Sequence, residues 1–370
     1  MKVVITGGAG FIGTALCRRL VADGHHVRVI DALTEQVHGT NPKPQMADGV
    51  EFIHADVREI ANRRELLDGF DGVVHLAAET GTAQSMYRIR HYVDVNEGGT
   101  AALLEAIAGC KQRPSRVVLS SSRSVYGEGA YIDTNGATLL PPPRTRQQLD
   151  LNRWELEAPD GSPLKPAATS ETVGFAPGSI YAATKASQEL LIESAASALG
   201  FSAAILRFQN VYGEGQSLQN PYTGIISIFF NRARQGLKLP IYEDGLETRD
   251  FVHVDDVVGA IMASLVRDVP KSVVCNIGAG VATTVSDLAR RLIQAAGFDV
   301  PIEVTGQFRV GDIRHNWADI SRAKILLGYE PKIDLADGLE RFCSWAANEP
   351  IFVDRLDKAT EELRQKGLAN

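Results

Sequence analysis

Short apolar runs rich in β-branched residues alternate with longer stretches of helical periodicity along the first half of the chain. The predicted strands cover residues 2–6, 26–31, 51–54, 72–76, 116–121, 203–207 and 273–277. Apolar residues recur at helical spacing over residues 11–23, 96–109 and 180–199. Strands that alternate with helices favour a parallel sheet with right-handed crossovers, so we predict a doubly wound α/β fold.

Two regions depart from this alternation. Residues 127–178 are rich in Pro, Gly and polar side chains, and we expect an irregular insertion beside the binding cleft. Strict alternation is lost after Asn210, which indicates a second, smaller α/β domain that binds the substrate. The expected division is 1–208 plus about 250–277 for the nucleotide-binding domain, 209–249 plus 278–345 for the substrate-binding domain, and 346–370 for a helical tail. Residues 354–365 are predicted to form a charged helix that faces solvent.

Charge and composition narrow the partners and the compartment. The net charge is −7 with both signs scattered, so neither nucleic acid nor an anionic membrane surface is expected as a partner. Residues 1–5 lead straight into a strand, and no apolar run is long enough to span a bilayer, so we expect a cytoplasmic protein. The four cysteines are far apart and form no CxxC pair, which indicates reduced core residues and no metal site.

A glycine-rich turn joins the first predicted strand to the first predicted helix. Gly7, Gly10 and Gly13 allow a tight turn, close approach to a pyrophosphate and close helix packing, while Phe11 and Ile12 open the helix towards the phosphates. This context predicts a dinucleotide site in a Rossmann-type domain. Asp31 ends the next strand, where a carboxylate accepts hydrogen bonds from the ribose and repels a 2′-phosphate, so NAD is favoured over NADP. The alternative for Asp31 is an ordinary loop residue.

Two further segments follow strands on the same predicted sheet edge. Asp56 and Val57 come after the third strand, where they would meet the adenine, although Asp56 is also a common turn residue. Leu76, Ala77 and Ala78 follow the fourth strand with small side chains that would let the backbone pass close to the cofactor. We interpret the preceding residue, His75, as a packed histidine.

Tyr181 and Lys185 lie one helical turn apart in the predicted helix 180–199, so their side chains share one face. A nearby ammonium lowers the pKa of a phenol, and we predict that Tyr181 acts as a base with Lys185 beside it. Ser122 follows the fifth predicted strand, at the sheet edge where ligands bind, and would hydrogen-bond the substrate hydroxyl that Tyr181 deprotonates. The alternative for the Tyr–Lys spacing is a plain amphipathic helix.

These motifs together resemble the NAD-dependent epimerase/dehydratase family of extended short-chain dehydrogenase/reductases. The likeness includes the glycine turn, Asp31, the serines before VYG at 125–127, the Tyr181/Lys185 pair, RFQNVYG at 207–213 and RDFVHV at 249–254, and it extends to about residue 345. The resemblance implies a triad of Ser122, Tyr181 and Lys185, with NAD bound tightly and recycled in place. It also implies a homodimer that pairs through the helix before Cys110 and the helix bearing Tyr181.

The residues after Ser122 separate the reactions of this family. Sugar-nucleotide 4,6-dehydratases carry an Asp–Glu pair there for the elimination of water, whereas this chain has Arg123 and Ser124. An isomerase of the 4-epimerase kind, acting through a transient 4-ketone, is therefore expected. The stretches 79–87, 121–129 and 209–224 resemble the type that interconverts dTDP-L-rhamnose and dTDP-6-deoxy-L-talose. The alternatives are a sugar-nucleotide 4-ketoreductase or dehydrogenase, a UDP-hexose or UDP-uronate 4-epimerase, and a dinucleotide-sensing relative without catalysis.

The resemblance also assigns residues to the nucleotide-sugar substrate, which would be a dTDP- or UDP-sugar. Arginine holds a diphosphate bidentately, so Arg249 and Arg309 are expected to clamp it, with Asn210 donating from its amide. Asp312 would bind the nucleotide ribose and Tyr242 would stack on the base. The expected neighbours of the sugar and the nicotinamide are Thr82, Ser122 and Phe208, with Gln84 and Arg123 as further contacts or solvated loop residues.

Overall fold

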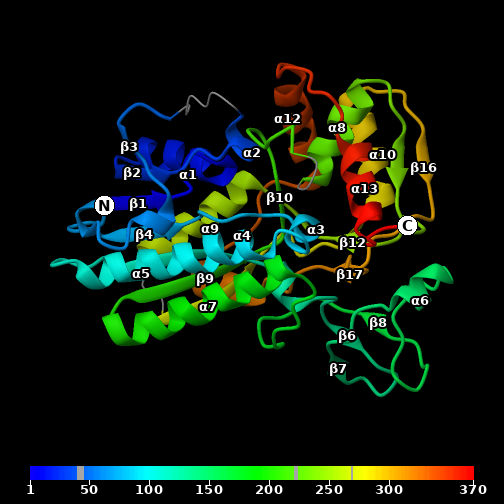
Figure 1. The fold of residues 1–370 in the computed structure, drawn as a ribbon, viewed down its shortest axis with the longest axis horizontal. Helices are drawn as coiled ribbons and strands as arrows, with labels where there is room; N and C mark the ends of the chain where they lie inside the picture. Colours follow the sequence, from blue (N-terminus) through cyan, green and yellow to red (C-terminus); the bar gives the residue numbers. More distant parts are fainter. Residues whose placement is uncertain (40–45, 221–223, 268–269) are drawn as a thin grey trace.

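A parallel sheet forms the centre of the larger lobe. The structure, a computed structural model, describes residues 1–39, 46–220, 224–267 and 270–370 (Figure 1). Within them, a seven-stranded sheet has the order β14-β9-β5-β4-β1-β2-β3, and every neighbouring pair is parallel. Its strands are β1 (Lys2–Thr6), β2 (His26–Asp31), β3 (Val50–His54), β4 (Gly72–His75), β5 (Arg116–Ser122), β9 (Ser202–Phe208) and β14 (Ser272–Ile277). The predicted doubly wound fold is confirmed, and the strand ends agree closely with the expected ranges.

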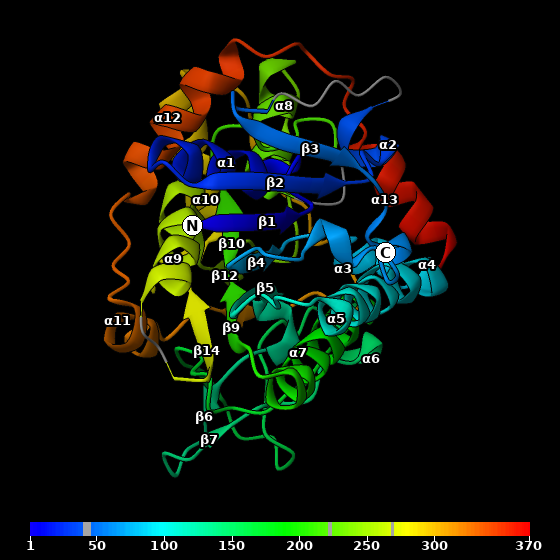
Figure 2. The same cartoon turned by 90° about the vertical axis from the view of Figure 1, so that its left-hand side faces the viewer.

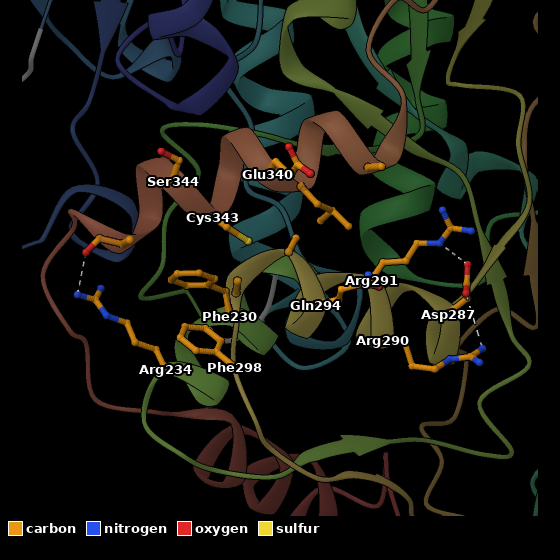
Figure 3. Close-up of a pocket in the computed structure, with 15 residues that line it drawn as sticks. Phe230, Arg234, Asp287, Arg290, Arg291, Gln294, Phe298, Glu340, Cys343 and Ser344 are labelled. Carbon is orange, nitrogen blue, oxygen red and sulfur yellow. Dashed lines mark hydrogen bonds and ion pairs between the residues drawn. The ribbon is translucent and has the colours of Figure 1, made fainter.

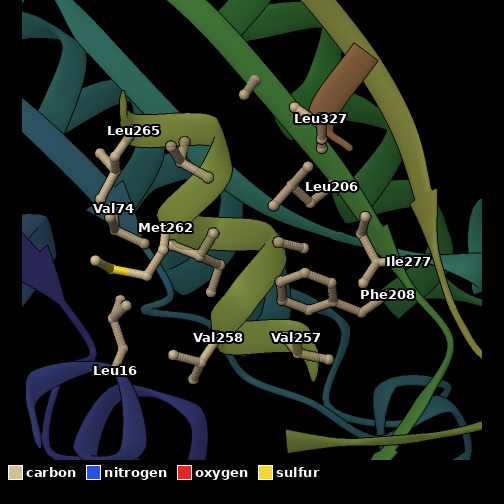
Figure 4. Close-up of a cluster of buried hydrophobic side chains, with 14 of the residues drawn as sticks. Leu16, Val74, Leu206, Phe208, Val257, Val258, Met262, Leu265, Ile277 and Leu327 are labelled. Atoms are coloured by element: carbon tan, nitrogen blue, oxygen red, sulfur yellow. The ribbon is translucent and has the colours of Figure 1, made fainter. Parts of the chain in front are cut away.

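Helices cover both faces of this sheet. On one face lie α1 (Phe11–Ala22) and α9 (Val254–Val266), whose Leu16 and Val257 share a buried apolar cluster with strand residues (Figure 4). On the other face lie α5 (Gly99–Gly109) and α7 (Ile180–Leu199), whose Leu103 and Ile192 belong to a second cluster. The helix expected over 96–109 begins at Gly99 and follows a π-helical segment, Asp94–Gly98.

The parallel arrangement brings the carboxyl ends of the strands to one edge. Thr6 at the end of β1 pairs in register with His75 at the end of β4, and Ser122 at the end of β5 pairs with Phe208 at the end of β9. The predicted cofactor turn and the predicted serine therefore lie along the same edge of the sheet.

A smaller lobe carries its own apolar core. Phe230, Leu288 and Phe342 come from three helices and share one cluster with Leu239 and Val300. By contrast α11 (Ser321–Leu327), which falls in the range expected for this lobe, packs into the core of the larger lobe. The residues 221–223, part of the 209–224 stretch, lie outside the described residues. The elements of the smaller lobe are β10 (Asn210–Tyr212), α8 (Ile225–Arg234), β11 (Leu239–Ile241), β12 (Thr248–Arg249), β13 (Phe251–His253), β15 (Thr283–Thr284), α10 (Val285–Ala296), β16 (Ile302–Val304), β17 (His315–Asn316) and α12 (Leu335–Ala347).

The insertion at 127–178 is more regular than its composition predicted. A small antiparallel sheet has the order β7-β6-β8, built from β6 (Tyr131–Ile132), β7 (Thr138–Leu139) and β8 (Lys165–Pro166), and α6 (Arg146–Asp150) follows the prolines. Tyr131, Leu156 and Leu164 form a local apolar cluster that explains this order. The insertion projects from the body of the molecule below the smaller lobe (Figure 1).

The C-terminal helix differs from the prediction of a solvent-facing helix. α13 (Leu356–Gln365) is amphipathic, and it buries Leu356, Ala359, Thr360 and Leu363 against the rest of the chain. Its charged side chains occupy the opposite face, as the helical period requires. Figure 2 shows α13 running along the side of the molecule towards α3 (Thr82–Ser85) and α4 (Ile89–Val93).

Candidate active site

The glycine turn after β1 has the geometry that a dinucleotide site requires. Gly7 adopts a φ of +71°, and a Cβ there would lie 2.6 Å from the backbone nitrogen of Ala77. A Cβ on Gly13 would lie 2.5 Å from the Cα of Gly8, so only glycine lets α1 pack this closely on the turn. Among the described residues no side chain caps α1 at Gly10, which leaves the first N–H groups, including those of Phe11 and Ile12, to point at a ligand.

Asp31 has a structural role in the same turn. Its carboxylate accepts hydrogen bonds from the backbone of Ala9, at 3.0 Å, and of Leu33, at 2.8 Å. Each carboxylate oxygen accepts more than one hydrogen bond, so Asp31 retains capacity for the ribose hydroxyls that the sequence predicted. The structure therefore places the predicted NAD-selecting residue directly beside the glycine turn.

Asp56 and Val57 lie at the start of a 3₁₀ turn on the neighbouring strand end. The Asp56 carboxylate pairs with the Arg58 guanidinium at 2.6 Å, and this hydrogen bond lowers the pKa of Asp56. Val57 is buried and leaves no room for a side chain at Gly99. Asp56 therefore has a structural role in this turn, and its contact with the adenine stays a prediction. The segment 76–78, with the predicted Leu76, Ala77 and Ala78, lies half-buried against the glycine turn.

Tyr181 is fixed in the first turn of α7 by polar contacts from other elements. The side chain of Ser179 caps the helix by accepting a hydrogen bond from Ala182 N, and the Tyr181 N–H donates to Ser85 Oγ at 3.0 Å. Thr184 donates to the Tyr181 carbonyl and in turn accepts a hydrogen bond from the buried Asn96 amide at 2.9 Å. Ser85 and Asn96 were not predicted from the sequence, because their partners are distant along the chain.

The phenol of Tyr181 is hydrogen-bonded to the side chain of Ser122 at the end of β5. Burial raises the pKa of Tyr181, while its hydrogen bond with Ser122 and the positive charge of Arg123 act in the opposite direction. The structure therefore joins Ser122 and Tyr181 as predicted. The positive charge of Arg123 also acts on this phenol, and the role of Lys185 beside it stays a prediction.

Lys185 is buried one turn further along α7 and is held away from solvent. Its ammonium donates to the carbonyl of Ser120 at 2.9 Å. Burial lowers the pKa of Lys185 to about 7, although the carboxylate of Glu189 acts to raise it. A lysine with this pKa exchanges protons near neutral pH, which suits a group that relays a proton to or from the site.

A buried polar network beneath the triad was missed from the sequence. Glu189, on the same face of α7 as Lys185, accepts hydrogen bonds from Ser121 and from Arg207, the latter at 2.7 Å. Arg207 also donates to the Tyr126 hydroxyl at 2.8 Å, and Tyr126 donates to Asn276 at 2.7 Å. This network ties the carboxyl ends of β5, β9 and β14 to α7. In the sequence, the feature that could have indicated this network is an acidic residue on the buried face of a predicted helix.

Several donors that face the predicted sugar site have no partner in the described part of the chain. Arg123 donates to the Asn210 carbonyl oxygen at 3.2 Å, yet its Nη1 and the Asn210 amide nitrogen are both buried without a hydrogen bond. Burial and the nearby charge of Arg249 lower the pKa of Arg123 to about 9, so Arg123 stays charged at neutral pH. Unpaired buried donors are costly, and a ligand rich in hydroxyl and phosphate oxygens would satisfy them.

The predicted diphosphate and ribose residues come together in the smaller lobe. Arg249 is buried, and its guanidinium donates to Asp312 Oδ1 at 3.1 Å and to the carbonyl of Arg314 at the same distance. Arg309 lies over the Tyr242 ring at 4.7 Å and donates to its hydroxyl at 3.3 Å. The Nε of Arg309 has no partner among the described residues.

The other expected neighbours of the sugar and the nicotinamide differ in exposure. Thr82 is exposed at the start of α3, whereas Phe208 at the end of β9 is buried (Figure 4). Gln84 is also buried and accepts a hydrogen bond from the Tyr92 hydroxyl at 3.1 Å, so it is not a solvated loop residue.

A second buried ionic network joins the insertion to the smaller lobe. Arg144 of the insertion and Arg314 both contact Glu243, at 2.8 Å and 3.1 Å. Arg144 also donates to the carbonyl of Asp312 at 2.9 Å, and the Arg314 N–H donates to Glu128 at 2.7 Å. The loop that carries Asp312 is therefore held by the insertion. None of these pairings was predicted, because their members are far apart in the sequence.

Two buried histidines, His75 and His253, have structural partners. His75 is fully buried between Thr6 and Thr100, at 2.6 Å and 3.0 Å, and burial lowers its pKa to about 3. The prediction of a packed histidine is confirmed. His253 is also buried, accepts a hydrogen bond from the backbone at the start of α9, and lies 2.9 Å from Glu214.

A separate groove lies between α8, α10 and α12 on the smaller lobe, away from the triad (Figure 3). Phe230 and Phe298 line it together with charged side chains that have partners, such as Arg291 with Asp287 at 2.6 Å.

The described residues contain no cluster of His, Cys, Asp and Glu able to hold a metal ion. Nor does any described helix combine the length and apolarity needed to cross a membrane. All of the cysteines are buried and free.

Comparison with known sequences matches most of the chain to one family. The profile of the NAD dependent epimerase/dehydratase family covers residues 3–149 and 157–278. A dTDP-L-rhamnose 4-epimerase of Burkholderia thailandensis is 39% identical over 351 residues, which is 94% of this chain and 95% of that protein. A putative UDP-glucose 4-epimerase of Methanocaldococcus jannaschii is 30% identical, over 94% of this chain and 98% of that protein.

Solved structures agree with this similarity. MoeE5 in complex with UDP-glucuronic acid and NAD superposes with a TM-score of 0.76 at 29% identity, covering 94% of this chain and 99% of that chain. The UDP-glucose 4-epimerase of Thermotoga maritima with UDP-glucose has the same TM-score and coverage at 28% identity. The fold of this chain therefore matches that of proteins crystallised with a dinucleotide or a nucleotide sugar.

Proposed function

The chain belongs to the NAD dependent epimerase/dehydratase family, and from this premise we propose that it is an NAD-dependent nucleotide-sugar 4-epimerase that interconverts dTDP-L-rhamnose and dTDP-6-deoxy-L-talose. The observation that carries the reaction type is the Tyr181 phenol, hydrogen-bonded to Ser122 on the sheet edge that also bears the glycine turn. The choice of sugar is supported by the Burkholderia relative. The UDP-sugar relatives and structures define the competing substrates.

The residues of the glycine turn would hold NAD. The N–H groups at the start of α1 would bind the pyrophosphate, Asp31 would accept the ribose hydroxyls, and Phe208 at the end of β9 would lie beside the nicotinamide. When bound, NAD supplies the site that accepts hydride from the sugar C4 and returns it to the opposite face. The enzyme would then end each turnover in its starting redox state.

The chain's own residues would move the proton. Ser122 would hydrogen-bond the sugar 4-hydroxyl, and Tyr181 would remove its proton as the C4–H bond breaks, leaving a 4-ketone on the sugar. Rotation of this flat ketose about its diphosphate would present the other face, and Tyr181 would return the proton to the new alcohol. Arg123 would favour the ionised phenol, since its charge acts to lower the pKa of Tyr181.

Arg123 and Ser124 also separate this reaction from elimination. Loss of water from C6 and C5 needs an acid and a base beside the sugar. Arg123 stays protonated at neutral pH and donates to Asn210, so it has no lone pair with which to act as that base. A 4-epimerase is therefore favoured over a 4,6-dehydratase.

Product analysis by NMR tests this proposal. Purified protein without added cofactor is incubated with dTDP-L-rhamnose, and in parallel with UDP-glucose, UDP-glucuronic acid and GDP-sugars. Appearance of dTDP-6-deoxy-L-talose, with protein-bound NAD released on denaturation, is the expected result. Turnover only with added NAD(P)H and a stoichiometric product would identify a 4-ketoreductase, and selective conversion of a UDP-sugar would replace the proposed substrate.

We also propose a homodimer that pairs through α5 and α7. Leu190 on α7 is 53% exposed and would lie in this interface. Sedimentation velocity at low concentration should give a dimer for the wild type and a monomer for Leu190→Glu. A monomeric wild-type protein would overturn this assignment.

A further inference from the structure

The residues 356–370, called the tail segment here, consist of α13 and the chain after it. Asp354, just before the segment, and Asp357 in its first turn both pair with the buried Arg232 on α8. Together with the buried apolar face of α13, these ion pairs fix the tail segment on the smaller lobe. The segment is therefore an integral part of that lobe.

The buried face of α13 contacts the tyrosine that is expected to stack on the nucleotide base. Thr360 is only 7% exposed, and its hydroxyl lies 3.0 Å from the hydroxyl of Tyr242. Tyr242 also accepts the hydrogen bond from Arg309. The orientation of the Tyr242 ring is thus set from two sides, and Thr360 supplies one of them.

The chain after α13 pairs with the segment that carries Arg309. The Val310 N–H donates to the Leu368 carbonyl at 3.0 Å, and the Phe308 N–H donates to Asn370 Oδ1 at 2.7 Å. These hydrogen bonds flank an antiparallel bridge between residues 309 and 369. The backbone on both sides of Arg309 is therefore held by the tail segment.

The tail segment also reaches the larger lobe and the insertion. The ammonium of Lys366 lies 4.7 Å above the ring of Tyr87, which follows α3. Arg146 of α6 donates to the Gly367 carbonyl at 3.4 Å. Figure 2 shows α13 descending along the edge of the molecule towards the end of the chain. The segment spans the side of the molecule where the two lobes meet.

We propose that the tail segment forms the outer wall of the subsite for the nucleoside diphosphate, and that Thr360 and residues 368–370 are positioning residues for Tyr242 and Arg309. Arg309 Nε, which has no partner among the described residues, is the donor that this wall holds ready for a phosphate oxygen. The tail segment then controls affinity for the nucleotide and leaves the proton and hydride transfers unchanged. This inference rests on the proposed function, because it assigns the substrate end of the same site.

Two variants of the NAD-bound protein test the proposal. Thr360→Val removes the hydroxyl at nearly constant shape, and deletion of residues 368–370 removes the pairing with Arg309. Loss of one neutral hydrogen bond corresponds to about threefold to tenfold in an equilibrium constant, which sets the expected rise in the Kd for dTDP with Thr360→Val. The deletion should raise the Kd at least as much. In both variants KM should rise with the Kd, while kcat and NAD content stay within about twofold of wild type.

A matched control comes from the same helix. Lys358 is exposed on α13, and Lys358→Ala should leave the Kd for dTDP unchanged. Calorimetry with dTDP and with UDP measures each variant, and a thermal melt reports whether the deletion still folds. A Kd for dTDP close to the wild-type value in Thr360→Val and in a folded deletion variant would overturn the tail proposal alone. If the wild type binds neither dTDP nor UDP, both the tail proposal and the proposed function fail.

Discussion

The sheet edge that bears the glycine turn and the smaller lobe are called here, after their proposed roles, the cofactor edge and the substrate lobe. Different kinds of interaction stabilise the two regions. At the cofactor edge, consecutive backbone groups from Gly7 to Gly13 make the site, and steric contact with Ala77 and Gly8 fixes their positions. In the substrate lobe, Arg249 and Arg309 are held by side chains and carbonyl groups from distant segments, including the insertion and the tail segment. A site made of backbone tolerates almost no side chain, whereas a site made of ion pairs depends on every partner being present. Substitutions in the two regions should therefore have different effects on stability and on cofactor binding.

Removal of the phenolic oxygen should have the largest effect. General acid–base catalysis contributes about 10²- to 10⁴-fold, so Tyr181→Phe should lower kcat by about 10³-fold. Both regions should stay intact, because Tyr181 is anchored through its backbone by Ser85 and Thr184. NAD content and dTDP affinity should consequently match wild type. Turnover near the wild-type rate would remove Tyr181 as the base.

Breaking the ionic network should destabilise the substrate lobe strongly. Arg144 is 6% exposed and lies between Glu243 and Glu128, so Arg144→Met removes the guanidinium that pairs with both buried carboxylates and leaves them only their contacts with Arg314. Removal of one member of a buried ion pair costs about 3–5 kcal/mol, and urea unfolding should show a loss of that order. Arg153→Met in the same insertion removes an exposed pair with Glu157 and should be close to wild type. Equal stability of the two variants would contradict the distinction between buried and surface pairs.

A substitution in the glycine turn should cost less stability but eliminate the cofactor. Gly7→Ala forces a side chain into a left-handed backbone conformation and against the backbone of Ala77, with a strain of about 1–3 kcal/mol. Gly24 has a similar φ of +77°, but a Cβ there would meet no described atom within 4 Å, so Gly24→Ala isolates the cost of the backbone conformation. Only Gly7→Ala should purify without NAD. Retention of NAD by Gly7→Ala would show that the close approach is not required.

The two regions also differ in how far the sequence predicts them. The strands of the sheet, the glycine turn and α7 follow from local patterns, because each depends on residues close in sequence. The pairing of Ser122 with Tyr181 was expected from the position of Ser122 at a strand end and from the family resemblance. The family of the chain follows from the same motifs. The network around Glu243 and the contact of Thr360 with Tyr242 do not, since their members are separated by 71 to 118 residues and carry no shared spacing.

The tail illustrates the reason for that failure. Its charged residues predicted a solvent-facing helix, but the amphipathic period of α13 also contains Leu356, Ala359 and Leu363 on one face. Which surface this face covers is decided by the ion pairs of Arg232 and by the pairing of residues 368–370. Neither is visible in the local sequence. The effect of the Arg123 charge on the Tyr181 phenol was not predicted either, because the positions of the charged groups around the phenol depend on the assembled sheet.

The smallest effect is a pH dependence that reports the burial of Lys185. Burial lowers its pKa from an ordinary value of 10.5 to about 7, so above pH 7 the folded chain mostly holds the neutral amine while the unfolded chain still binds the proton. Unfolding then takes up a proton, so the contribution of Lys185 to stability should rise as the pH increases from about 7.5 to 9, by at most about 1.4 kcal/mol per pH unit. The buried thiols act in the opposite direction once the unfolded cysteines begin to ionise near pH 9, because burial raises their pKa values.

Lys185→Met should remove the rise due to this lysine, and urea unfolding of both proteins at several pH values between about 7.5 and 9 measures the difference in slope. The methionine fills most of the same space and leaves the thiols unchanged. The comparison therefore separates the effect of lysine protonation on stability from the effect of side-chain packing. An unchanged slope in Lys185→Met would mean that the ammonium is solvated in the folded protein and does not share the dry environment of Glu189 and Ser121.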